Sequence, residues 1–276
     1  MEESNIKINI ISIEEGIKLS KNFPSLSYTR EFFKFREDKY NLKSGFLAVY
    51  KNDNLIFLLP ADYSKDAFYC VYKDYTEPFV LGEFSRDILN KAIDKLKTEL
   101  GFKKVEFNLA FLKNNIFFLS GGSELSVFIL KINEEEDRDS LFKKFKKTTR
   151  NEIRKSEKYG FDLRIENVKN IDKIYELYAS NMKRHGTPLR PKSYFEELFK
   201  YYGDKCKTIE AYSKNELAGV NIVFIKDNYL RLQYNYSNIK YWPYCINNLL
   251  YYKMIEWGGE NGIRYFDFGP SSNKEI

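Results

Sequence analysis

The residues best suited to binding chemistry concentrate in one basic stretch, LFKKFKKTTRNEIRKSEKYG, which spans residues 141–160. Within it, cations recur at spacings of three and four residues, on one face of a predicted helix: Lys143, Lys147, Arg150, Arg154 and Lys158. Like charges at these spacings repel one another, so an anionic group opposite them would stabilise the helix. The pattern is typical of a solvated basic face, or of a cradle for phosphate or carboxylate groups that the two arginines bind bidentately.

Residues that flank this stretch mark the ends of the predicted helix. Asp137 and Asp139 precede it, where carboxylates favour the positive end of a helix dipole, and Gly160 follows as a left-handed terminator. A narrow second face carries residues that can pack: Phe142, Phe145, Thr149, Ile153 and Ser156. We therefore expect one helix over residues 141–160, preceded by an acidic linker at 133–139.

Composition narrows the classes of function. The chain has 276 residues, 43% of them hydrophobic and 30% charged, and its net charge of +6 favours an anionic partner. Three widely separated cysteines and a single histidine predict neither a disulfide framework nor a metal site. No apolar run reaches the roughly 18 residues of a membrane span, and the N-terminus lacks the apolar core of a signal peptide. A cytoplasmic protein is expected, with membrane contact, if any, only peripheral.

Periodicity supplies the elements that must position these residues. In the first half we expect strands at 45–50, 55–60, 68–72, 105–109, 117–120 and 127–132, and helices at 13–23, 27–37 and 86–100. In the second half we expect strands at 161–165, 207–212, 217–225, 229–236 and 263–268, and helices at 171–183, 192–202 and 246–260. The predicted fold class is α/β, with mixed α+β sheets.

The two halves repeat one another. Residues 48–55 match residues 210–217 at an offset of 162, and residues 100–107 match residues 261–268 at an offset of 161. A near-constant offset across a hairpin, a helix and a strand indicates two similar units in tandem. Only the second half carries the basic stretch, so we expect that unit to hold the active site.

Three segments of the second half carry a family resemblance: KKTTRNEIRKSEKYG, His185-Gly186-Thr187-Pro188 and Arg264-Tyr265-Phe266-Asp267-Phe268-Gly269. They resemble the tandem GNAT-fold aminoacyltransferases of the Fem type, which build peptidoglycan cross-bridges. The resemblance implies two GNAT-like (acyl-CoA N-acyltransferase) domains, which we place at residues 1–132 and 133–276. It also implies that an activated acyl group is transferred to an amine, such as that of a muropeptide precursor, with aminoacyl-tRNA or acyl-CoA as the donor and no permanently bound cofactor.

One segment departs from the acyl-CoA enzymes that the chain resembles. Those enzymes carry a glycine-containing turn whose backbone amides hold the pyrophosphate at the start of a helix. The corresponding segment here, Ser237–Tyr244, contains no glycine. This departure favours a donor other than coenzyme A, as in the bridge-forming group.

Acyl transfer to an amine needs a polarised carbonyl group and a route for one proton. Asp267 could accept that proton, or could be a structural carboxylate paired with a basic residue, as its counterpart Glu106 in the first half suggests. Tyr236 ends a strand where GNAT-like sheets splay, and a backbone amide there or its hydroxyl could polarise the carbonyl; simple aromatic packing is the alternative. These two residues are the catalytic candidates.

Seven further residues are candidates for substrate binding: Lys147, Arg150, Arg154, His185, Tyr234, Asn235 and Asn247. His185, in a Gly-Thr-Pro turn, could line the acceptor cleft or be an exposed, inert side chain. Asn247, at a predicted helix start, could present an amide to a phosphate or only cap the helix.

Three functions remain open from the sequence. The leading hypothesis is an acyl- or aminoacyltransferase in peptidoglycan bridge formation. The second is an N-acyltransferase that uses acyl-CoA or a carrier protein and acts on a sugar or a small amine. The third is a non-catalytic protein whose basic helix binds tRNA or an anionic glycan.

Overall fold

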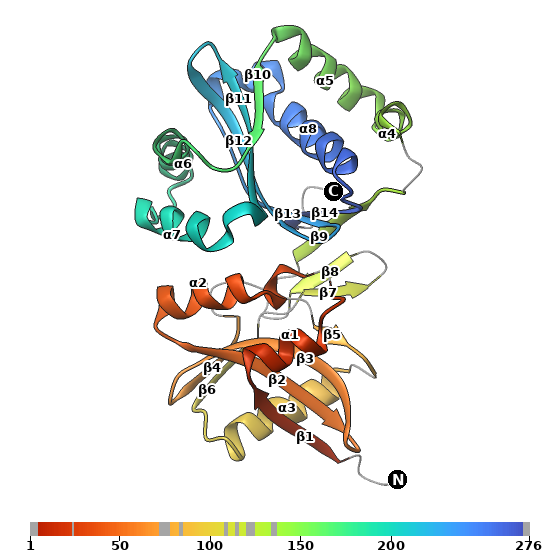
Figure 1. Cartoon of the computed structure of the whole chain (residues 1–276), viewed down its shortest axis with the longest axis vertical. Helices are drawn as coiled ribbons and strands as arrows, with labels where there is room; N and C mark the ends of the chain where they lie inside the picture. Colours follow the sequence, from red (N-terminus) through yellow and green to blue (C-terminus); the bar gives the residue numbers. More distant parts are fainter. Residues whose placement is uncertain are drawn as a thin grey trace. The chain divides into compact units, whose positions relative to one another are not determined.

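The computed structural model describes residues 5–23, 25–71, 78–82, 85–107, 110–113, 116–119, 125–133 and 137–272 (Figure 1). The chain divides into two compact units. Unit 1 comprises residues 1–128 and 270–276, and unit 2 comprises residues 129–269.

Unit 1 is built on a mixed sheet. Its elements are β1 (Ile6–Ile11), α1 (Ile13–Leu19), η1 (Leu26–Tyr28), α2 (Arg30–Tyr40), β2 (Lys43–Lys51), β3 (Asn54–Tyr63), β4 (Ala67–Cys70), β5 (Phe79–Val80), α3 (Arg86–Thr98) and β6 (Lys104–Phe107). The strand order is β1-β2-β3-β4-β6, with β5 beside β3. Neighbours are antiparallel except β4 and β6, which are parallel. Two short strands follow, β7 (Ala110–Lys113) and β8 (Ile116–Leu119).

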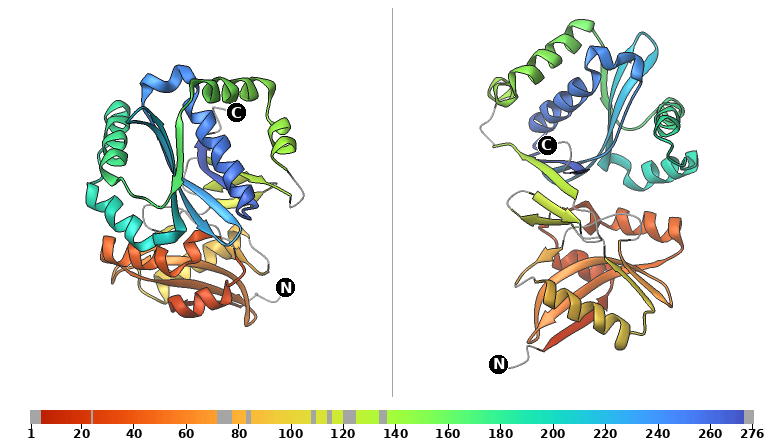
Figure 2. Two further views of the ribbon diagram at one scale, coloured as in Figure 1. Left: turned by 45° about the horizontal axis from the view of Figure 1, so that its top comes forward. Right: turned by 180° about the vertical axis from the view of Figure 1, so that it is seen from behind.

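Unit 2 repeats this plan. After β9 (Leu125–Lys131) its elements are α4 (Arg138–Lys144), α5 (Lys147–Tyr159), β10 (Asp162–Glu166), α6 (Ile171–His185), α7 (Lys192–Tyr202), η2 (Gly203–Lys205), β11 (Cys206–Ser213), β12 (Glu216–Lys226), β13 (Tyr229–Ser237), η3 (Ile239–Tyr244), α8 (Ile246–Glu260) and β14 (Tyr265–Ser272). The strand order is β10-β11-β12-β13-β14-β9. Helices α5 and α8 lie on one face of this sheet, and α6 and α7 lie on the other (Figures 1 and 2).

The internal repeat that the sequence predicts is confirmed by the sheet registers. Each unit runs strand, two helices, three antiparallel strands, helix and a final parallel strand. Both hairpins also carry a β-bulge at the matching residue, with Tyr50 paired to Leu55 in unit 1 and Tyr212 paired to Leu217 in unit 2. A bulge is a specific local irregularity of pairing. Its recurrence at the offset of 162 residues therefore indicates a duplicated fold.

The predicted single helix over residues 141–160 is wrong, because the chain breaks it into α4 and α5. Phe145 adopts an extended conformation between them. The break allows the rings of Phe142 and Phe145 to pack against Tyr252 of α8, at centroid distances of 5.3 and 6.1 Å. Arg150 closes the gap, since its Nη1 donates to the carbonyl oxygens of Lys143 and Phe145 at 2.9 and 2.6 Å. Aromatic packing and satisfied carbonyl groups thus outweigh helix continuity.

The predicted acidic linker also ends earlier than expected. Residues 134–136 lie outside the described residues. Asp137 is the N-cap of α4, and its side chain accepts a hydrogen bond from the Ser140 N–H at 2.7 Å. The last residues of the acidic run therefore begin a helix, as N-cap chemistry favours.

Helix α8 packs on the sheet so closely that one of its glycines has no room for a side chain. A Cβ on Gly258 would lie 2.5 Å from the ring of Phe266, which is fully buried, whereas a Cβ on the neighbouring Gly259 would meet nothing within 4 Å. Shape complementarity between α8 and β14 thus depends on Gly258.

We expect Gly258→Ala to lower the free energy of unfolding by about 1–3 kcal/mol through overpacking. The matched control, Gly259→Ala in the same helix, should raise it by up to about 1 kcal/mol through helix propensity. Urea denaturation of both variants measures the two effects, and equal effects of the two substitutions would contradict this account of the packing.

Candidate functional site

The sheet of unit 2 opens between β13 and β14. The two strands pair in parallel only where Tyr229–Arg231 faces Tyr265–Asp267. Strand β13 continues to Ser237, but from Leu232 onward it has no partner in the described part of β14. This confirms the splay that the sequence predicts, and it exposes one edge of β13 to whatever enters the opening.

Asp267 lies at the last paired position, where the strands begin to diverge. Its carboxylate is fully buried. One oxygen accepts a hydrogen bond from the backbone N–H of Gly269 at 2.7 Å, and the other accepts one from the Tyr229 hydroxyl at 2.9 Å. Asp267 is also the register partner of Arg231. These contacts fit the structural alternative from the sequence, because they hold the backbone at the branch point.

The three candidates at the end of β13 lie on two faces of the sheet. Tyr234 and Tyr236 face α6 and α7: the Tyr236 ring lies 5.3 Å from that of Tyr178, and the two β13 tyrosines stack at 5.7 Å. Asn235 faces α8, where its Nδ2 donates to Oδ1 of Asn221 at 2.6 Å. Side chains alternate along a strand, so a single substrate would meet the tyrosines and Asn235 from opposite sides.

Tyr236 has the chemical character expected of a catalytic hydroxyl. Only 6% of the residue is exposed, yet its hydroxyl has no hydrogen-bond partner among the residues that the structure describes. Burial raises the pKa of the phenol above its ordinary value, with the neighbouring Tyr234 and Tyr178 adding to the shift and Arg190 opposing it. The group is therefore a neutral O–H donor at physiological pH, available to a substrate atom.

A clamped segment between α6 and α7 borders these tyrosines. The hydroxyl of Tyr175 donates to the carbonyl oxygen of Arg190 at 3.0 Å, and the Arg190 N–H donates to the Tyr178 hydroxyl at 2.7 Å. The Arg190 guanidinium lies 4.4 Å from the centroid of the Tyr194 ring, and the Tyr194 hydroxyl lies 3.2 Å from that of Tyr234. Tyr178, Arg190 and Tyr194 are not among the candidates from the sequence, because no spacing signal links them to β13.

The basic side chains of α5 have different surroundings. Lys147, the first residue of α5, is exposed. Arg150 uses one guanidinium nitrogen on the α4–α5 break, as described above. Arg154 lies over the Phe142 ring at 5.2 Å, a cation–π contact. The two arginines therefore help to fold this region, which leaves part of each guanidinium for an anion.

His185 and Asn247 end and begin helices. His185 is the last residue of α6 rather than part of a loop; it is exposed, and its Nε2 accepts from Arg184 at 3.1 Å. Asn247 lies in the first turn of α8, which has no side-chain cap, and its Oδ1 is buried without a partner in the described structure. The next residue, Asn248, ties this helix start to Glu152 of α5 at 2.6 Å.

The glycine-free segment forms a 3-10 helix, η3, in place of an open turn. Tyr241 is buried, and its hydroxyl donates to Glu216 at 2.7 Å. The same carboxylate accepts from Asn238 at 2.9 Å and from Lys240 at 2.6 Å. Side chains therefore fill and anchor this segment, which leaves no glycine-lined cradle of the kind that binds pyrophosphate. Beside η3, a polar cavity of about 280 Å³ lies between α6 and the β11–β12 turn.

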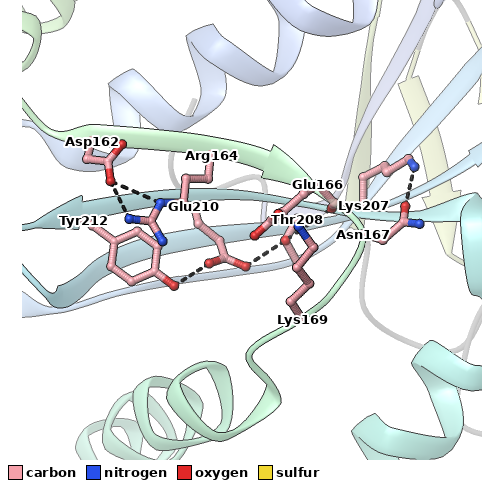
Figure 3. Close-up of polar contacts among 9 residues, drawn as sticks. All are labelled: Asp162, Arg164, Glu166, Asn167, Lys169, Lys207, Thr208, Glu210 and Tyr212. Carbon is pink, nitrogen blue, oxygen red and sulfur yellow. Dashed lines mark hydrogen bonds and ion pairs between the residues drawn. The ribbon is translucent and has the colours of Figure 1, made fainter.

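A buried carboxylate, that of Glu210, lies on the same sheet face as Tyr236, because both residues are register partners of Val220. Figure 3 shows its polar contacts. Only 1% of Glu210 is exposed, and its oxygens accept from Oγ1 of Thr208 at 2.8 Å and from the Tyr212 hydroxyl at 2.6 Å. Arg164 lies across the strand pair, but its guanidinium binds Asp162 and covers the Tyr212 ring at 4.5 Å. The alternation Thr-x-Glu-x-Tyr at residues 208–212 is the sequence signal that places these three side chains on one face of the strand.

Comparison with known proteins assigns the second unit. Residues 143–275 match the family described as Acetyltransferase (GNAT) domain. The second unit is a GNAT acyltransferase domain. No curated protein matches the chain. The match agrees with the predicted enzyme class, an acyltransferase, and disfavours the non-catalytic reading.

Solved structures place the whole chain in the tandem version of this fold. A crystal structure of FemX is 13% identical, with a TM-score of 0.66, and the alignment covers 98% of this chain and 90% of FemX. L-PGS from Bacillus licheniformis is 13% identical, with a TM-score of 0.53, and the alignment covers 97% of this chain and 80% of L-PGS. A tandem GNAT protein from the clavulanic acid biosynthesis pathway is 9% identical, with a TM-score of 0.52, and the alignment covers 99% of this chain and 91% of that one. The chain has a Fem-type tandem GNAT fold, as the sequence predicts.

Two further features bear on the chemistry of this GNAT protein. The described residues contain no cluster of three or more His, Cys, Asp or Glu residues that could hold a metal ion, and no helix among them is long and apolar enough to cross a membrane. Burial raises the pKa of the Cys206 thiol well above its ordinary value, so this cysteine is protonated and unsuited to nucleophilic catalysis.

The anchoring of η3 should depend on pH. The hydrogen bonds from Lys240 and then Tyr241 lower the pKa of Glu216 below its ordinary value. Its contribution to stability is therefore complete above the unfolded-state pKa and is lost as the pH falls through the lower folded-state pKa. We expect the wild type to lose more stability than Glu216→Gln between about pH 5 and about pH 3, measured by urea denaturation. Glu176→Gln, on the other side of the cavity, is the control and should follow the wild type.

Proposed function

We propose that this protein transfers an activated acyl or aminoacyl group to an amine in the opening between β13 and β14. The observation that carries the proposal is the hydroxyl of Tyr236, whose ring is buried and which lacks a partner within the described residues, beside a splayed GNAT sheet. The amine nitrogen forms the new amide bond, and the ester or thioester bond of the donor breaks. Tyr236 donates a hydrogen bond to the carbonyl oxygen as negative charge develops there. One proton passes from the amine to the leaving group.

Two observations support aminoacyl-tRNA as the donor. The segment η3 is filled by Tyr241 where coenzyme A enzymes carry a glycine-containing turn. Residues 143–158 hold eight cations and two carboxylates, an excess equal to the net charge of +6 of the whole chain. Such a surface attracts a polyanion. The resemblance to Fem-type enzymes then suggests a lipid- or nucleotide-linked muropeptide as the acceptor, in peptidoglycan bridge formation in a bacterial cytoplasm.

A second candidate is an N-acyltransferase that uses acyl-CoA or a carrier protein and acts on a sugar or a small amine. It is favoured by the match to acetyltransferases and by the uncapped start of α8, where Oδ1 of Asn247 is buried without a partner in the described structure. Helix N-termini bind phosphate groups. Transfer assays with aminoacyl-tRNA and with acyl-CoA separate the two candidates, and failure of both donors would contradict the proposal.

We expect Tyr236→Phe to lower kcat by about 10²–10³-fold with little change in KM, because the hydroxyl acts on the carbonyl in the transition state. The control is Tyr251→Phe, which removes a hydroxyl from α8 on the other face of the sheet and should leave kcat within about threefold of the wild type. Steady-state kinetics with the active donor measures both variants. Equal rates for Tyr236→Phe and the wild type would remove this residue from the mechanism.

Asp267→Asn tests whether the branch-point carboxylate is also the proton acceptor. Both oxygens accept hydrogen bonds, so an amide would oppose one of the two donors and lower the free energy of unfolding by about 1–3 kcal/mol. Tyr229→Phe removes one donor but keeps the carboxylate. If Asp267 is the base, turnover falls for Asp267→Asn far more than for Tyr229→Phe at matched stability. Unchanged turnover for Asp267→Asn leaves the residue a purely structural role.

A further inference from the structure

Large apolar side chains gather on the surface at one end of unit 2. Three large apolar residues of η3 are exposed, Ile239 by 57%, Trp242 by 43% and Tyr244 by 38%, and Tyr159 at the end of α5 is exposed by 37%. The rings of Tyr159 and Tyr244 are 4.1 Å apart, so the patch is continuous across the two elements. We call these four residues the η3 tip.

The η3 tip is held in place from beneath. Tyr241 is buried under it and bonded to Glu216. The indole N–H of Trp242 donates to Oγ of Ser237 at 2.8 Å, and the guanidinium of Arg184 lies 4.4 Å from the Trp242 ring. Fixed contacts on the inner side keep the apolar groups facing outward. Exposed apolar groups in a rigid cluster are typical of an interaction site.

Cations surround the η3 tip. The last turn of α5 carries the exposed Lys158, and the last turn of α6 carries the exposed Lys183 and Arg184. Three of the nearby carboxylates have partners within the protein: Glu216 binds Lys240, Glu152 binds Asn248 and Glu157 lies 3.6 Å from Lys253. The surface therefore presents an apolar centre with a positive rim.

We propose that the η3 tip docks on the surface of an anionic phospholipid bilayer. Tryptophan and tyrosine favour the headgroup region of a membrane, where their rings and polar atoms are both accommodated. A protein binds a membrane surface through the insertion of apolar groups at that level and through the attraction of lysines and arginines to anionic lipids. The η3 tip and its surroundings have both features. This inference does not depend on the proposed function, because it concerns binding and not catalysis.

A polyanion such as tRNA is the main alternative occupant. Aromatic rings and cations also bind single-stranded nucleic acid, through stacking and phosphate contacts. Ile239, however, is the most exposed member of the tip and has no flat face on which a base could stack. An aliphatic side chain gains from insertion into acyl chains, so the composition of the tip favours lipid.

Co-sedimentation with vesicles tests the proposal on the whole chain. We expect the wild type to bind vesicles of phosphatidylcholine mixed with phosphatidylglycerol, and to bind phosphatidylcholine vesicles at least about tenfold more weakly. Trp242→Ser should weaken binding to the mixed vesicles by about five- to tenfold. The matched control is Leu100→Ser, which removes an apolar side chain of similar exposure, 43%, from unit 1 and should leave binding unchanged.

A fluorescence measurement keeps the test valid if Trp242→Ser does not fold. In a Trp257→Phe background, Trp242 is the only tryptophan of the chain. Its emission should shift to the blue, and its quenching by acrylamide should fall, when mixed vesicles are added. An unchanged spectrum, equal binding to neutral vesicles and mixed vesicles, or a response to tRNA but not to vesicles would overturn the proposal.

Discussion

The short parallel pairing between β13 and β14 is the constraint on which the second unit depends. Three residues of each strand pair, and the strands then separate. Asp267 holds the point of separation, since it joins Gly269 on its own strand to Tyr229 on the neighbouring strand. Gly269 has a φ of 78°, which a residue with a side chain rarely adopts. Continued pairing would satisfy the edge of β13 and leave no opening beside Tyr236.

The opening places different chemistry on its two sides. On the α6 and α7 side, tyrosines and Arg190 surround a neutral phenol whose hydroxyl lacks a partner in the described structure. On the α8 side, Asn235 and Asn221 form an amide pair next to Met254. A carbonyl group between the strands would have a hydroxyl donor on one side and the helix start of α8 on the other. This arrangement suits acyl transfer without a covalent nucleophile.

The way η3 packs bears both on which acyl donor fits the second unit and on which side chains its surface exposes. In the segment where acyl-CoA enzymes are expected to carry a glycine-containing turn, Tyr241 is buried here, and its hydroxyl donates to Glu216. Because Tyr241 takes the inner position, its bulky neighbours Trp242 and Tyr244 lie on the outside. The inward position of Tyr241 thus accounts both for the lack of a glycine-lined phosphate cradle and for the exposed aromatic surface.

Much of the architecture followed from the sequence alone. Helical and period-two patterns placed α7 and α8 at their observed bounds, and the constant offset between the halves predicted the duplication that the matching bulges at Tyr50 and Tyr212 confirm. These features are local or repeated, so each can be recognised from a short stretch of the sequence. The basic stretch also predicted an anionic partner for unit 2, and this remains a prediction.

Only the tertiary structure decided how the candidate residues share the site. It divided the basic helix at Phe145, because two rings gain more by packing on Tyr252 than a continuous helix gains by one further turn. It separated Asn235 from Tyr236, brought Tyr178 and Arg190 beside Tyr236, and buried Glu210 between two hydroxyl groups. Such contacts join residues far apart in the chain, and their energies depend on burial and orientation, which no local pattern of residue types records.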